Sequence, residues 1–220
     1  MIQGIRVKVC GLTSLVDAGL ADAIGADYLG FILYAASPRF VTLEHYRAMA
    51  VRLPARRRVA VSVEPGEAEL AAQAAAGFDF FQVHFRPGPD DEVRLERWSR
   101  AVGRERLWLA PKLPPGVEVT AAMRQAAEGI VVDTFHAGGF GGSGRTGDWE
   151  GFARQRQLYA ENTWILAGGL NAANIGAALA RSGARVVDVN SGVESAPGIK
   201  DAVKLREFAA ELRRAATPAG

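Results

Sequence analysis

Gly25-Ala26-Asp27-Tyr28-Leu29-Gly30-Phe31-Ile32-Leu33 is the stretch of sequence that decides the fold. Its second part, residues 28–33, is a short aromatic and aliphatic run of the kind that forms a buried strand. A helical pattern precedes it: Thr13 or Ser14 can cap a helix that runs to Ile24, and Gly25 then stops that helix. The stretch therefore predicts a helix end, a tight turn and a strand in immediate succession.

The same kind of turn recurs along the chain. Gly77-Phe78-Asp79 follows a helical pattern at residues 67–76, and Gly183-Ala184-Arg185 follows one at residues 173–181, which Asn171 can cap. Each of these turns precedes another apolar run. One turn type reused in this way indicates a weak internal repeat of helix and strand.

Eight such runs alternate with helical stretches rich in Ala, Leu and Arg, and we predict strands at residues 5–10, 28–33, 58–63, 80–85, 106–110, 129–133, 164–167 and 186–189. Alternating strands and helices predict a parallel sheet. The 220 residues allow about 27 for each unit, near the ~31 of a typical barrel. The fifth unit, residues 111–129, is the faintest and holds a helix of about ten residues.

We therefore predict an α/β protein of a single domain, a (β/α)8 TIM barrel that covers residues 1–220. A doubly wound open sheet is the competing architecture. It is disfavoured because no Gly-x-Gly-x-x-Gly motif follows the first predicted strand.

The composition excludes several classes of partner. The formal net charge is only +2 and the basic residues are scattered, so we expect no nucleic-acid partner. No segment approaches 18 apolar residues without charge, which predicts no membrane span, and the first residues do not resemble a signal peptide. The single cysteine, Cys10, agrees with a cytoplasmic protein.

In a barrel, function collects at the carboxyl ends of the strands. Cys10 ends the first predicted strand beside Gly11, and Lys8 lies on the same face. Such a thiol is either buried and structural, or a base or nucleophile whose pKa a nearby cation lowers. Asp133 ends the sixth strand, where it either braces the next loop or serves as a general acid.

Glycine-rich segments follow the last three predicted strands. Residues 138–149 contain six glycines, which points either to a ligand-binding loop or to a disordered connector. Gly168-Gly169 follows the seventh strand and Asn190-Ser191-Gly192 follows the eighth, the positions at which barrels commonly bind phosphate. Arg39 is suited to hold a carboxylate, whereas His84 has no neighbour at metal-ligand spacing, so we expect no metal.

Together these motifs resemble the phosphoribosylanthranilate isomerases of tryptophan biosynthesis, nearly from end to end. The resemblance rests on Lys8-Val9-Cys10-Gly11-Leu12-Thr13, residues 27–32, Ser37-Pro38-Arg39, Gln82-Val83-His84, Asp133-Thr134, residues 141–149, Gly168-Gly169-Leu170-Asn171 and residues 188–194. It implies a (β/α)8 barrel without a cofactor that carries out an Amadori rearrangement.

The resemblance also implies roles for individual residues. The family's general base matches Cys10, its general acid matches Asp133, and the arginine beside the anthranilate end of the substrate matches Arg39. The expected phosphate-binding residues are Gly142, Ser143, Gly144, Gly168, Gly169, Asn190, Ser191 and Gly192.

Two departures from the family pattern keep alternatives open. Phe85 stands where the family usually has a glycine, which predicts a narrower pocket or an altered loop, and Pro111 precedes a family-like lysine. A related barrel isomerase acting on another phosphorylated aminosugar is one alternative. A barrel that binds a phosphorylated metabolite without catalysis is the other. In each case the partner is a small phosphorylated molecule, and both a monomer and a homodimer agree with the sequence.

Overall fold

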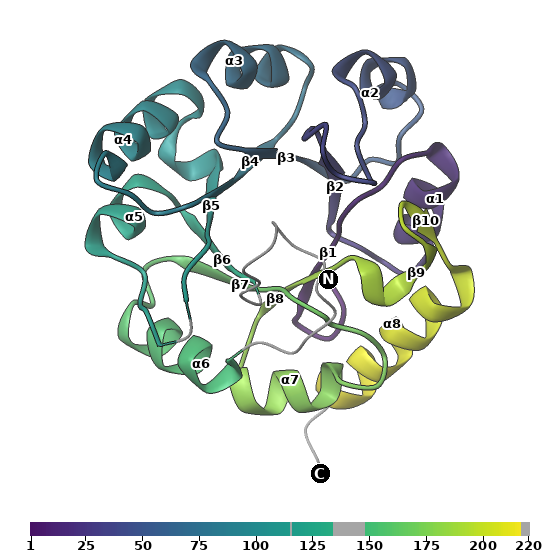
Figure 1. The fold of residues 1–220 in the computed structure, drawn as a ribbon. Helices are drawn as coiled ribbons and strands as arrows, with labels where there is room; N and C mark the ends of the chain where they lie inside the picture. The colour runs from purple at the N-terminus through teal and green to yellow at the C-terminus, as the bar shows by residue number, and fades with distance from the viewer. Residues whose placement is uncertain (115, 134–147, 217–220) are drawn as a thin grey trace.

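The computed structural model describes residues 1–114, 116–133 and 148–216, and these contain a closed barrel of eight parallel strands (Figure 1). Each strand pairs with the next along the chain, and the last closes the barrel by pairing with the first, Val187 beside Val7. The eight predicted strands are confirmed, with every end within one residue of its predicted position. They are β1 (Arg6–Val9), β2 (Tyr28–Ile32), β3 (Arg57–Val63), β4 (Phe80–Phe85), β5 (Leu107–Pro111), β6 (Gly129–Val132), β7 (Thr163–Leu166) and β8 (Val186–Val189).

Helices surround this barrel as an outer ring (Figure 1). Gly25, Gly77 and Gly183 follow three of them with φ angles of 89°, 87° and 63°, so the predicted helix-ending glycines are confirmed. The helices are α1 (Leu15–Ala23), α2 (Leu43–Ala50), α3 (Glu67–Ala75), α4 (Asp91–Val102), α5 (Ala121–Ala126), α6 (Trp149–Leu158), α7 (Ile175–Ser182) and α8 (Ala202–Ala216).

Smaller elements complete the chain. A 3-10 helix, η1 (Arg104–Arg106), precedes β5, and another, η2 (Ser191–Val193), follows β8. After η2 comes an antiparallel hairpin of β9 (Glu194–Ala196) and β10 (Ile199–Lys200), which the sequence analysis did not predict. In Figure 1 this hairpin lies beside α1 and α8.

Some local predictions need correction. Of the two candidates for the cap of α1, Ser14 is confirmed: its hydroxyl accepts from the Asp17 amide, whereas Thr13 donates to the Gly198 carbonyl at 2.7 Å. Asn171 does not cap α7, because its side chain accepts from the Ala173 amide in the turn before the helix. The helix of the fifth unit is also shorter than expected, with six residues in α5.

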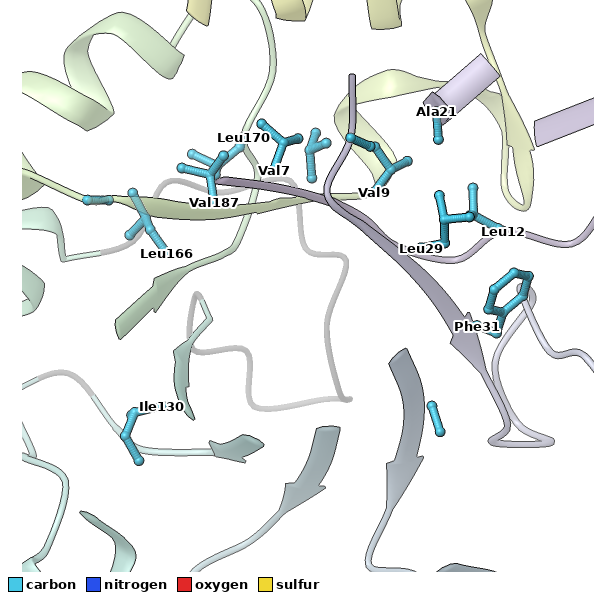
Figure 2. Close-up of a cluster of buried hydrophobic side chains, with 14 of the residues drawn as sticks. Val7, Val9, Leu12, Ala21, Leu29, Phe31, Ile130, Leu166, Leu170 and Val187 are labelled. Carbon is cyan, nitrogen blue, oxygen red and sulfur yellow. The ribbon is translucent and has the colours of Figure 1, made fainter. Parts of the chain in front are cut away.

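The alternation of the strands divides the core into two layers. Outward-facing side chains such as Val7, Val9 and Val187 pack beneath the helices with Leu29 and Phe31 (Figure 2). The alternate positions of the same strands face inward and fill the barrel, and they include Tyr28, Val59, Val61, Trp108, Val131, Ile165 and Val186. A residue's parity along its strand therefore decides whether it supports the helices or the barrel interior.

Aromatic rings fill the amino-terminal end of the barrel. The Trp108 ring lies 5.1 Å from the Tyr28 ring and 4.9 Å from the Phe80 ring, measured between centroids. Gly129 makes room for this arrangement, since a Cβ there would stand 2.3 Å from Cδ1 of Trp108. Side chains therefore fill this end of the barrel, and we expect the functional site at the carboxyl end.

We expect Gly129→Ala to destabilise the protein by about 1–3 kcal/mol, because the added methyl overpacks the ring cluster. Urea unfolding followed by circular dichroism measures this loss. Gly19→Ala is the matched control: Gly19 lies in α1 with open space around it, and alanine there should be neutral or stabilising by up to about 1 kcal/mol. Equal urea midpoints for Gly129→Ala and the wild type would contradict the prediction.

Candidate active site

A pocket opens at the carboxyl ends of the strands, where the fold predicts function. It brings together seven of the predicted site residues, Cys10, Arg39, Asp133, Gly168, Gly169, Asn190 and Ser191. The other residues that line it are Ile32, Tyr34, Ser37, Val61, Val63, Gln82, His84, Val131, Ala167, Leu170 and Asp188. Gly192 is not part of this lining, and Gly142, Ser143 and Gly144 lie outside the described residues.

The glycines at the pocket rim have specific backbone roles. Gly168 and Gly169 adopt φ angles of 92° and 63°, which favour glycine, so the segment after β7 bends sharply beside the pocket. Gly192 packs against this segment, since a Cβ on it would stand 2.0 Å from the Leu170 carbonyl oxygen. The segments after β7 and β8 are therefore held side by side at one part of the pocket.

Gly11 permits another close approach. Its φ is 69°, and a Cβ there would stand 2.7 Å from both Cδ of Arg39 and Oδ1 of Asn190. Gly11 therefore lets side chains from the segments after β2 and β8 meet beside Cys10.

A buried ion pair lies beneath the pocket. Nζ of Lys8 donates to Oδ2 of Asp188 at 2.6 Å, and the Lys8 side chain is 0% exposed. The Lys8 ammonium is also near enough to Cys10 for its charge to favour the thiolate and lower the pKa of the thiol. Gly30 of β2 leaves space for both side chains, since its Cβ would lie 2.9 Å from Cε of Lys8 and 3.0 Å from Sγ of Cys10. Lys8 of β1 is thus the nearby cation that a reactive thiol at Cys10 would need.

Burial nevertheless raises the pKa of the Cys10 thiol, and the nearby Lys8 ammonium offsets only part of that effect. Asp188 adds to the rise in the Cys10 pKa because its negative charge opposes a second anion. The pKa of Lys8 is itself raised: burial lowers it, but Asp188 and Cys10 outweigh burial. Without substrate, Lys8 is therefore a charged ammonium and Cys10 is a neutral thiol.

We expect iodoacetamide to alkylate Cys10 slowly at neutral pH. The thiolate is the reactive form, so the rate should rise about tenfold per pH unit below the pKa and keep rising past the pKa of an ordinary thiol. Mass spectrometry of the intact protein reads out the reaction, and the single cysteine removes any competing site. A fast rate that is independent of pH from 6 to 9 would rule out the raised pKa.

His84 and Gln82 project from β4 into the same region. Burial and the Lys8 charge lower the pKa of His84 to about 3, so its ring is neutral at physiological pH. Nε2 of Gln82 lies 2.8 Å from Nε2 of His84 and donates to it. Oε1 of Gln82 then has no hydrogen-bond partner within the part of the chain that the structure describes. A histidine with so low a pKa is a poor general base, and it serves here as a neutral hydrogen-bonding group.

Asp133 stands just after β6, half-buried, and lines the pocket. The ammonium of Lys112 is near enough to interact electrostatically with the Asp133 carboxylate. Burial and the neighbouring Arg86 lower the pKa of Lys112, while Asp133 acts in the opposite direction. The predicted acid and the predicted base thus occupy one pocket from β6 and β1.

Arg39 is already engaged in the structure. Its guanidinium binds Glu194 through two nitrogens, and Lys200 reaches the same carboxylate. The sequence analysis missed both Glu194 and Lys200. The turn Pro197-Gly198 between them was the available signal, because it marks the hairpin that carries both residues.

Phe85 does not line the pocket, so the predicted narrowing of the pocket is wrong. It faces outward from β4, buried, with its ring 5.3 Å from that of Trp98 on α4. Its neighbour His84 takes the inward position, as the alternation of a strand requires. Pro111, paired with Phe85 across β4 and β5, is also absent from the pocket lining.

Comparisons with known proteins agree on one family. The family model described as "N-(5'phosphoribosyl)anthranilate (PRA) isomerase" matches residues 7–211. An N-(5'-phosphoribosyl)anthranilate isomerase of Chromohalobacter salexigens is 35% identical over 99% of this chain and 98% of that protein. One from Pseudomonas putida strain GB-1 is 37% identical over 96% of this chain and 98% of its own length.

Solved structures give the same result. The phosphoribosyl anthranilate isomerase of Thermus thermophilus superposes with a TM-score of 0.77 at 32% identity, covering 96% of this chain and 99% of the other. Another such isomerase was crystallised with reduced 1-(o-carboxyphenylamino)-1-deoxyribulose 5-phosphate, and it matches with a TM-score of 0.72 at 29% identity, over 96% and 99% of the two chains. Within residues 1–114, 116–133 and 148–216, no helix is long and apolar enough to cross a membrane.

Proposed function

The chain belongs to the N-(5'-phosphoribosyl)anthranilate isomerase family, and from this we infer that it converts N-(5-phosphoribosyl)anthranilate to 1-(2-carboxyphenylamino)-1-deoxyribulose 5-phosphate. It is an aldose–ketose isomerase of tryptophan biosynthesis. One observation carries the inference best: a single pocket holds a cysteine, an aspartate and the segments after β7 and β8, the first of them bent at Gly168 and Gly169.

Asp133 is the general acid in this proposal. In its protonated form it donates a proton to the ribose ring oxygen while the bond from C1′ to that oxygen breaks. The lone pair of the anthranilate nitrogen forms the C1′=N bond at the same time, which leaves a cationic Schiff base. The position of Asp133 on the pocket wall after β6 supports this role.

Cys10 is the general base of the second step. As a thiolate it removes the proton from C2′, and the electron pair moves into a C1′=C2′ bond while the C1′=N pair returns to nitrogen. The resulting enolamine tautomerises to the ketone. The thiol of the free protein has a raised pKa, but the cationic Schiff base adds a positive charge beside it, which favours the thiolate together with Lys8.

The phosphate grip positions the sugar between these two groups. Backbone amides at Gly168, Gly169 and Ser191 support a phosphate site on the β7 and β8 side of the pocket, with Asn190 beside them. Fixing one end of the substrate in this way converts the encounter of sugar, acid and base into a reaction within one complex. Gly142, Ser143, Gly144 and Gly192 remain proposed members of this site.

A direct assay tests the function. Purified protein should convert phosphoribosylanthranilate, which is followed by the loss of anthranilate fluorescence, and the gene should let a tryptophan auxotroph that lacks this step grow without tryptophan. Folded wild-type protein without turnover would exclude the isomerase. Of the two alternatives, another phosphorylated aminosugar has lost its main support, because Phe85 and Pro111 do not line the pocket.

The partner in this proposal is a small phosphorylated molecule, and we place the enzyme in the cytoplasm, which its single cysteine supports. A relative from Thermotoga maritima is described as dimeric. Sedimentation equilibrium decides whether this chain is a monomer or a homodimer.

A further inference from the structure

We propose that Glu194 and Lys200, which lie behind Arg39, set the orientation and the net charge with which Arg39 binds the anthranilate carboxylate. This inference rests on the proposed function, because it concerns how that substrate is recognised. Neither residue lines the pocket, so both are positioning residues. Glu194 acts through Arg39, and Lys200 acts mainly through Glu194, with a second contact to Asn190 and a minor effect on the pKa of Cys10.

The geometry of Arg39 divides its donors into two sets. Nε donates to Oε1 of Glu194 at 2.9 Å and Nη2 donates to Oε2 at 2.7 Å, so Glu194 occupies the side of the guanidinium. Arginine has five N–H donors in a rigid plane. The two on Nη1 and the second on Nη2 remain, and they form the end-on fork that binds a carboxylate through two bonds. Because Arg39 lines the pocket, the structure assigns this fork to the substrate.

Lys200 determines the net charge of the cluster formed by Arg39, Glu194 and Lys200. Its Nζ donates to Oε1 of Glu194 at 2.8 Å, and the exposed fractions of the Lys200 and Glu194 side chains are 0% and 4%. An Arg39–Glu194 pair alone is neutral and has little attraction for an anion. With Lys200 the three side chains carry one net positive charge in a place from which water is excluded, where charges interact strongly.

The ionisation of Glu194 agrees with this arrangement. Burial alone raises the pKa of Glu194, but the hydrogen bonds from Arg39 and Lys200 outweigh burial and lower it. The pKa of Lys200 is lowered, because burial outweighs the contact with Glu194. The short contacts on both sides of Glu194, 2.7 Å from Arg39 and 2.8 Å from Lys200, arrange the three side chains as a cation, an anion and a cation in a row.

Further contacts hold Lys200 in place. Its Nζ donates to Oδ1 of Asn190 at 2.9 Å, and its backbone amide donates to Oδ1 of Asp17 at 2.9 Å. The amide of Gly198 adds a third donor to Glu194 at 3.2 Å. The β9–β10 hairpin is thus tied to α1 and to the pocket residue Asn190. It gives the Arg39 fork a fixed direction that a lone arginine on a loop lacks.

The test measures the binding of two ligands to variants in which the net charge of Arg39, Glu194 and Lys200 changes stepwise. One ligand is reduced 1-(o-carboxyphenylamino)-1-deoxyribulose 5-phosphate, and the other is the same compound without the carboxyl group. The side chains of Arg39, Glu194 and Lys200 carry one net positive charge in the wild type, none in Lys200→Met and two in Glu194→Gln. The double variant Glu194→Gln/Lys200→Met returns to one. Isothermal titration calorimetry gives each Kd.

We expect Lys200→Met to weaken binding of the carboxylate ligand about tenfold and to leave the ligand without the carboxyl group within twofold. The KM of the reaction should rise in parallel while kcat stays within a few-fold of the wild type. The double variant should regain most of the lost affinity, because Arg39 again carries an unbalanced charge. If Glu194 and Lys200 only stabilise the local structure, the double variant should instead bind the carboxylate ligand more weakly than either single variant.

Lys204→Met is the matched control, since Lys204 is an exposed lysine in the same region whose ammonium donates to the backbone carbonyl of Glu194 and not to its carboxylate. Both Kd values should stay within twofold of the wild type in this variant. Equal losses for the two ligands in Lys200→Met, or no rescue in the double variant, overturn the inference. A wild type that neither binds the carboxylate ligand nor turns over substrate contradicts the proposed function instead.

Discussion

Cys10→Ala should lower kcat by roughly 10²–10⁴, the contribution that a positioned general base makes. The reason is specific to this pocket: Cys10, directly after β1, lines it, and Lys8 beneath it is an ammonium that cannot accept a proton. The measurement is steady-state turnover of phosphoribosylanthranilate, corrected for the spontaneous reaction. KM should change little, because the phosphate and carboxylate contacts lie on other residues.

Binding and stability measurements make this result interpretable. The Cys10→Ala protein should bind reduced 1-(o-carboxyphenylamino)-1-deoxyribulose 5-phosphate with nearly wild-type affinity and unfold at a similar urea concentration. Cys10→Ser is the closer replacement, and it should also be slow because a serine hydroxyl ionises far less readily than a thiol. Turnover within threefold of the wild type in Cys10→Ala would remove Cys10 from the mechanism.

Asp133→Asn is expected to lower kcat by a similar factor, roughly 10²–10⁴, because the amide has the shape of the carboxyl group but no acidic proton to give to the ring oxygen. The effect should fall on kcat, with KM within a few-fold of the wild type. Asp22→Asn is the control: Asp22 lies on the outer helix α1, paired with Arg56, and its loss should leave turnover unchanged.

A second measurement separates ring opening from proton abstraction. The substrate carries hydrogen at C2′, and replacing it with deuterium slows the Cys10 step but not the Asp133 step. If ring opening limits Asp133→Asn, its deuterium isotope effect should be smaller than that of Cys10→Ser. An Asp133→Asn enzyme with wild-type kcat would assign the acid role elsewhere.

Much of this site was predictable because barrels place chemistry by position along the chain. Cys10 and Asp133 follow β1 and β6, and Gly168-Gly169 follows β7, so finding the strand ends located them. Helix caps were predicted less well. Asn171 is a residue type that often caps helices, but α7 begins after Asn174. The capping preference could not choose between these two positions, because both are asparagines.

Other features arise only when the barrel closes. Lys8 and Asp188 are 180 residues apart in sequence, and Arg39 and Glu194 are 155 apart. No local pattern links such residues, whereas the pairing of β1 with β8 places Lys8 opposite Asp188. The raised pKa of Cys10 depends in the same way on burial and on charges from three strands, which carry Lys8, Asp188 and Lys200.

Short apolar runs and glycine turns therefore determined, from the sequence alone, that eight strands would form and where each would end. They act over a few residues, which is the range of backbone sterics and of side-chain alternation. Only the tertiary structure decided which face Phe85 takes, what holds Arg39 and what charge surrounds Cys10. Those outcomes depend on burial and on electrostatic interaction between groups that the closed barrel brings within a few ångströms of each other.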